Sequence, residues 1–92
     1  MVPVAEVIPD ALAAVLRNAP QTPEKVAFAW RLTVGPALDR ATTIELRDAV
    51  LYVRAKDPAW RREVERSAPL IRRRLQALLG ADVLRRLDVR LS

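Results

Sequence analysis

One long amphipathic stretch dominates the second half of the chain and constrains the fold more than any other feature. Asp57 and Pro58 are typical of a helix start, and Gly80 is typical of a helix end. Pro69 lies inside the stretch, so we expect a kink, or a break into two segments, just before that residue. The apolar residues recur at helical spacing over about six turns: Trp60, Val64, Ala68, Ile71, Leu75, Leu78 and Leu79.

Two shorter helices are predicted nearer the N-terminus. The first begins at Asp10 and stops near Asn18, because the prolines at positions 20 and 23 prevent its continuation. Thr22 caps the second, which ends at Gly35-Pro36. Residues 1–9 are apolar but broken by two prolines, and we expect an extended arm there. The apolar positions of the second helix are Val26, Phe28, Ala29, Trp30, Leu32 and Val34.

From residue 42 the apolar period changes to two, which is typical of strands. Residues 42–47 and 51–56 alternate apolar with polar side chains, and residues 86–91 do so again after the long helix. Asp48-Ala49 separates the first two strands. Alanine is poor at the second position of a two-residue type I′ turn, so we expect a longer or bulged connection.

The predicted order is therefore α-α-β-β-α-β. Three strands with one apolar face need a covering layer, and the long helix can supply it. We expect an α+β two-layer sandwich in which residues 10–92 form a single domain. The third strand can run parallel or antiparallel to its neighbour.

The residue types argue against an enzyme. The chain contains no cysteine and no histidine, which removes thiolate and imidazole chemistry as well as the usual metal sites. It has no GxxxxGK[ST] or GxGxxG motif for binding a nucleotide phosphate. We therefore expect no catalytic residues, no metal and no cofactor. The chain has neither a membrane-spanning apolar run nor a signal-like start, so we also expect a cytoplasmic protein with no membrane partner.

The net charge of +5 arises in the second half of the chain, where arginine predominates. Arginine makes planar, bidentate contacts with phosphate and carboxylate groups. Such a surface can bind a polyanion, contact an acidic protein, or simply be solvated. The basic sheet face would also carry one aromatic ring, that of Tyr52. The candidate nucleic-acid-binding residues are Arg54, Lys56, Arg62, Arg66, Arg72, Arg73, Arg74, Arg86 and Arg90.

Several of these features in order resemble the bacterial DciA family over residues 28–91. The most specific part is a pair of tryptophans that frames the hairpin, with a glycine at each helix end. The residues that carry the resemblance are Trp30, Val34-Gly35-Pro36, Leu51-Tyr52-Val53, Asp57-Pro58-Ala59-Trp60, Leu75, Leu78, Leu79, Gly80, Val83 and Leu87.

The resemblance implies a KH-like fold and a non-enzymatic role in loading or operating the replicative helicase DnaB on single-stranded DNA. The residues that the resemblance assigns to the framework of the fold are Trp30, Gly35, Trp60 and Gly80. We therefore expect the arginines to contact the ligand. The GxxG loop of a true KH module is absent, so we expect no KH-style clamping of nucleotides. Two functions stay open: an accessory protein that binds single-stranded DNA or RNA, and an adaptor whose arginines contact an acidic protein partner.

Overall fold

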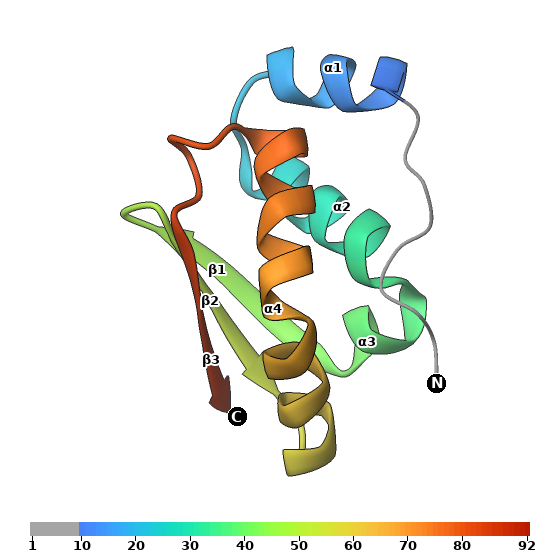
Figure 1. Ribbon diagram of the computed structural model, residues 1–92, viewed down its shortest axis with the longest axis vertical. Coiled ribbons are helices and arrows are strands. Elements are labelled where there is room, and N and C mark those ends of the chain that lie inside the picture. The colour runs from blue at the N-terminus through green and yellow to red at the C-terminus, as the bar shows by residue number, and fades with distance from the viewer. Residues whose placement is uncertain (1–9) are drawn as a thin grey trace.

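A computed structural model describes residues 10–92, so the predicted arm over residues 1–9 lies outside the described residues. Figure 1 shows a sheet on one side of the molecule and helices on the other. The α+β class and the predicted element order are confirmed, with one short helix added, while the KH-like arrangement stays a prediction. The elements are α1 (Asp10–Asn18), α2 (Pro23–Val34), α3 (Pro36–Arg40), β1 (Thr42–Arg47), β2 (Val50–Ala55), α4 (Pro58–Leu79) and β3 (Arg86–Leu91).

Side-chain capping defines the boundaries of the N-terminal helices. The Thr22 hydroxyl accepts a hydrogen bond from the Lys25 backbone N–H, as predicted for the start of α2. The buried Lys25 ammonium donates to the carbonyl oxygens of Arg17 and Ala19, at 3.4 and 2.9 Å. A cation at the C-terminal end of a helix satisfies carbonyls that have no partner within the helix. Lys25 therefore joins α1 to α2.

The short helix α3 was not predicted. Gly35 ends α2 with φ 86° and ψ 166°, a conformation that side-chain-bearing residues rarely adopt. Pro36 then occupies the first turn of α3, where its missing N–H costs nothing. Gly35-Pro36 was predicted only to end the second helix, although the same pair also starts a new helix.

The sheet has the strand order β1-β2-β3, with β2 in the centre. Strand β1 pairs antiparallel with β2, and β3 pairs parallel with β2. This settles the direction of the third strand, which the sequence left open. A parallel return needs a long crossover, and α4 provides it.

The hairpin turn is shorter than predicted. Arg47 pairs directly with Val50, so the connection is the two residues Asp48 and Ala49, with φ values of 51° and 65°. Positive φ at both positions is the type I′ geometry, whose twist matches that of the flanking strands. The expectation of a longer or bulged connection is therefore wrong, because strand pairing imposes a conformation that Ala49 disfavours.

We expect Ala49→Gly to stabilise the domain by about 0.5–1 kcal/mol. Glycine adopts positive φ without the steric cost that alanine incurs, although it loses more backbone entropy on folding. Thermal unfolding of the two proteins checks this, with Ala81→Gly as a matched control at an exposed position outside the sheet. A variant that melts below the wild type would contradict the strained turn.

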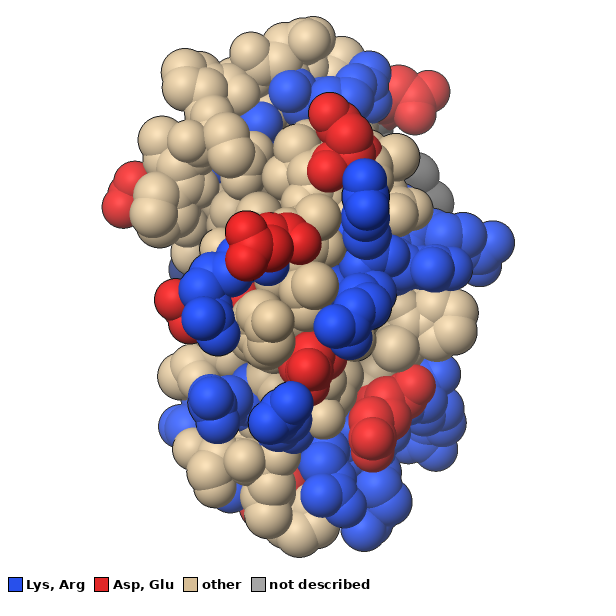
Figure 2. Space-filling view, turned by 90° about the vertical axis from the view of Figure 1, so that its left-hand side faces the viewer, with Lys and Arg blue, Asp and Glu red and all other residues tan. Residues whose placement is uncertain are grey.

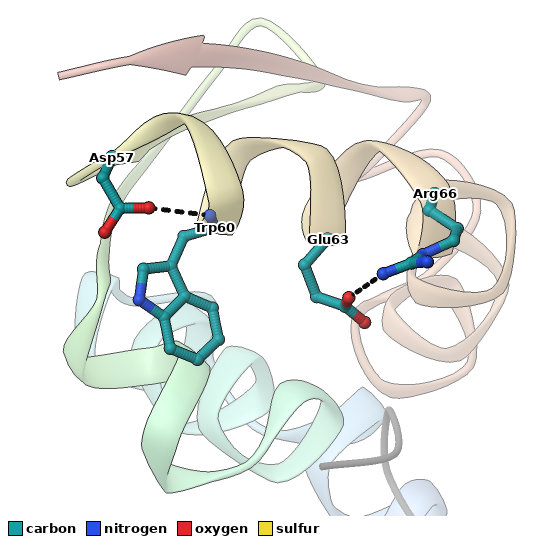
Figure 3. Close-up of polar contacts among 4 residues, drawn as sticks. All are labelled: Asp57, Trp60, Glu63 and Arg66. Carbon is teal, nitrogen blue, oxygen red and sulfur yellow. Dashed lines mark hydrogen bonds and ion pairs between the residues drawn. The ribbon is translucent and has the colours of Figure 1, made fainter. Parts of the chain in front are cut away.

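Helix α4 runs without a break from Pro58 to Leu79. The Asp57 carboxylate accepts a hydrogen bond from the Trp60 backbone N–H at 2.9 Å, which confirms the predicted cap (Figure 3). The predicted division of the helix at Pro69 does not occur. Pro69 and Glu65 both lie on the exposed side of α4, where water can bond the carbonyl that the proline leaves unpaired. Core contacts on the opposite side keep the residues before and after Pro69 in one helix, and the alternative of a kink within that helix stays a prediction.

The core lies between the sheet and the helices. The Trp30 side chain is 1% exposed, and its indole N–H donates to the Thr42 hydroxyl at 3.1 Å. Trp60 is only half buried at the edge of the core, and Figure 3 shows it pointing away from α4 toward the N-terminal helices. Phe28 is 48% exposed and does not belong to the core, contrary to prediction. The fully buried large side chains are Trp30, Thr33, Val34, Leu51, Val53, Val64, Ile71, Leu75, Leu78 and Leu84.

Candidate nucleic-acid interface

The outer face of the sheet carries three rows of side chains that the strand register aligns. The helices pack on the other face, where Leu51, Val53 and Ala55 are buried. The outer side chains of β2 belong to Val50, Tyr52 and Arg54. Across the three strands, the rows are Arg47–Val50–Arg86, Glu45–Tyr52–Asp88 and Thr43–Arg54–Arg90. Two basic rows therefore flank a row in which a tyrosine lies between two acids.

Each acid of the middle row is paired with an arginine on its own strand. Glu45 lies 3.4 Å from Arg47, and Asp88 accepts a hydrogen bond from Arg90 at 2.9 Å. The Arg90 hydrogen bond lowers the pKa of Asp88, and the charges of Arg86 and Arg54 lower it further. Asp88 therefore stays ionised and partly neutralises the predicted ligand Arg90.

Arg54 and Arg86 are less neutralised by neighbouring acids than Arg90 is. Both side chains are exposed, and neither forms an ion pair within the described part of the chain. Lys56 is exposed just beyond the end of β2. These three of the predicted residues are the least neutralised cations on the sheet side of the molecule.

The predicted arginine cluster on α4 is divided by helical geometry. Successive residues of an α-helix point about 100° apart, so Arg72, Arg73 and Arg74 cannot share one face. Arg72 and Arg73 are exposed, whereas Arg74 is half buried. Arg72 points toward β3, where it lines a shallow depression together with Arg86, Leu87, Ala68 and Pro69. One member of the cluster therefore joins the sheet arginines.

The first half of α4 carries more ion pairing. Arg66 is hydrogen-bonded to Glu63, as the i, i+3 spacing predicts (Figure 3). Arg61 lies 3.7 Å from Glu65. This i, i+4 pair was not predicted, although its spacing is a recognised signal. Arg62 lines a hollow with both of these acids. Arg62 and Arg66 are therefore placed in a mixed-charge surface.

The charged surface as a whole is mixed. Figure 2 shows Lys and Arg spread over much of one face, with Asp and Glu side chains between them. The helix and sheet arginines meet at the border between α4 and β3, through Arg72 and Arg86. Such a surface suits contact with a few phosphates more than continuous tracking of a long polyanion.

Two features of this surface were not predicted from the sequence. The guanidinium carbon of Arg47 lies 4.6 Å from the centre of the Tyr52 ring. A second hollow, lined by Thr43, Ile44, Glu45, Tyr52 and Arg54, lies beside the same ring. The register of a two-residue hairpin places residues 47 and 52 diagonally opposite, so the correct turn would have predicted the first contact.

Comparison with known protein families gives a match over nearly the whole chain. The family model described as Dna[CI] antecedent, DciA, matches residues 3–89. The chain belongs to the DciA family. This confirms the resemblance seen in the sequence, and it extends the resemblance toward the N-terminus. No curated protein and no solved structure matches the chain.

Membership of the DciA family implies an accessory role like that of a loader of the helicase DnaB. The family is not a catalytic one. Within residues 10–92, no helix is both long enough and apolar enough to cross a membrane. The framework residues Trp30, Gly35, Trp60 and Gly80 all lie in or beside the shared core or at helix ends.

Proposed function

We propose that this DciA-family protein is a non-enzymatic accessory factor that binds single-stranded nucleic acid while it assists DnaB. The observation that carries the proposal is the shared depression of Arg72 and Arg86. Because Arg72 of α4 and Arg86 of β3 line the same depression, the backbone of one nucleic-acid strand can contact both. Arg54, Lys56 and Arg73 are exposed cations that extend this contact.

The charges predict the type of binding. Contact with about three or four phosphates gives a slope of log K against log salt of about −2 to −3 for a single strand. Arginine–phosphate contacts carry no base information, so affinity depends little on sequence. Binding of this kind is weak at physiological salt, and a second attachment to the helicase would raise the effective concentration of the strand.

The test is fluorescence anisotropy of a labelled thymidine oligonucleotide at three salt concentrations. We expect the double variant Arg72→Gln, Arg86→Gln to flatten the salt slope by about 1.4, at about 0.7 for each lost phosphate contact. The control, Arg31→Gln with Arg40→Gln, removes the same charge from exposed positions of α2 and α3. It should leave most of the slope intact. The matching uridine oligonucleotide measures the preference for DNA or RNA.

Two outcomes would overturn the proposal. The first is no binding at low salt, and the second is an equal loss of slope in both double variants. Absence of binding would favour the adaptor function, in which the arginines contact an acidic protein partner. An equal loss of slope would remove the depression of Arg72 and Arg86 as the binding site. Recovery of purified DnaB by the immobilised protein after nuclease treatment tests the helicase contact without any nucleic-acid bridge.

A further inference from the structure

The Tyr52 ring lies at the centre of the outer sheet face, between the two basic rows. It is the only tyrosine of the chain. Its row neighbours, Glu45 and Asp88, are turned toward arginines of their own strands. An aromatic side chain on an uncovered sheet is a common platform for an unstacked base, because every base has a flat face that can stack.

Arg47 occupies one side of this ring. Its guanidinium carbon is 4.6 Å from the ring centre, within the range of a cation–π contact, while Glu45 holds the same guanidinium at 3.4 Å. These two contacts restrict the ring before any ligand arrives. A side chain that is already oriented loses less conformational entropy when it binds.

The other side of the ring borders an open hollow. Thr43 and Arg54 belong to the row beyond Tyr52, on the side away from Arg47. Together with Ile44 and Glu45 they line a shallow hollow against the tyrosine. The hollow therefore offers an aromatic wall, a hydroxyl, a carboxylate and a guanidinium in one place. A nucleobase presents the matching groups, namely a flat face and polar edges.

Arg54 and Arg86, which form no ion pair within residues 10–92, belong to the rows on either side of Tyr52. Arg86 aligns with Val50 and Arg54 lies four residues further along β2, which separates the two rows by about 13 Å at about 3.3 Å per residue. A backbone that places one phosphate near each arginine passes across Tyr52. One of the bases between these phosphates then lies over the ring.

We propose that Tyr52 and the adjoining hollow of Thr43, Glu45 and Arg54 form a stacking site for one nucleobase of a single strand. This inference rests on the proposed function and adds to it the site at which the strand is recognised as single-stranded. The bases of a duplex are already stacked, so a duplex cannot fill the hollow. Stacking is also tolerant of sequence, in agreement with a general accessory role.

The test compares a short thymidine oligonucleotide with an abasic strand that carries the same number of phosphates. We expect wild-type protein to bind the thymidine strand about 5-fold to 100-fold more tightly than the abasic one. Tyr52→Ala should remove most of that ratio, whereas Tyr52→Phe should keep it. The salt slope should stay the same in all three proteins, because no phosphate contact changes.

Phe28→Ala is the matched control, since it removes an exposed aromatic side chain from α2 rather than from the sheet. It should leave the thymidine-to-abasic ratio unchanged, and thermal melts confirm that each variant is folded. An equal ratio in wild type and Tyr52→Ala would overturn the stacking site while leaving nucleic-acid binding in place. Absence of binding to both strands by the wild type would overturn the proposed function and the stacking site together.

Discussion

Trp30→Ala should destabilise the domain by about 3–5 kcal/mol, enough to leave much of a small domain unfolded at room temperature. Trp30 is 1% exposed and belongs to the cluster that the helices share with the sheet. Truncation removes this apolar contact and leaves a cavity that rigid neighbours cannot fill. It also removes the indole N–H that donates to Thr42.

Urea denaturation followed by circular dichroism measures this effect. Trp60→Ala is the informative comparison, because it deletes the same side chain from a half-buried position at the start of α4. We expect a smaller loss of stability there. Equal losses would show that both indoles contribute equally to the core, contrary to their different burial. Thr42→Val measures the hydrogen bonds without the packing of the indole, because it removes both the acceptor for Trp30 and the donor to the carbonyl of Leu38 at 2.8 Å.

Ile71→Ala should cost about 2–5 kcal/mol. Ile71 is fully buried on the inner side of α4, two residues after Pro69. The proline removes one helical hydrogen bond nearby, so the burial of neighbouring side chains must hold the helix together at that point. Deleting the isoleucine side chain therefore weakens both the core and the continuity of α4.

Thermal unfolding of Ile71→Ala and of Arg73→Ala distinguishes the inner side of α4 from the outer. Arg73 is exposed and should change stability by no more than about 0.5 kcal/mol. The double variant Ile71→Ala, Pro69→Ala tests the proposed compensation, because alanine restores the missing hydrogen bond. Stability that does not recover would show that Pro69 places no demand on the packing around Ile71.

Local signals in the sequence determined the elements of this protein. The apolar spacing from Trp60 to Leu79 predicted α4, and the change to a period of two after residue 42 predicted the strands. Thr22 and Asp57 predicted two helix starts, because a capping side chain needs only its own first turn. The framework pattern also identified the family, since order and spacing of residues are properties of the chain itself.

Tertiary contacts decided the features on which local preference was weak or misleading. The pairing of β1 with β2 forced Ala49 into a conformation that alanine disfavours. Core packing of the residues before and after Pro69 kept α4 a single helix. The parallel direction of β3 depended on where α4 lies against the sheet.

For the candidate interface too, the sequence determined some features and the tertiary structure decided others. Composition placed the basic residues in the second half of the chain, but only the folded molecule shows which charges are already paired. Arg66 and Arg90 lie against acids, whereas Arg72 and Arg86 line one depression at the border of helix and sheet. Residues 72 and 86 belong to different elements, so no spacing along the chain could predict that they line the same depression. Charge is a property of the sequence, and its arrangement into a surface is a property of the packing.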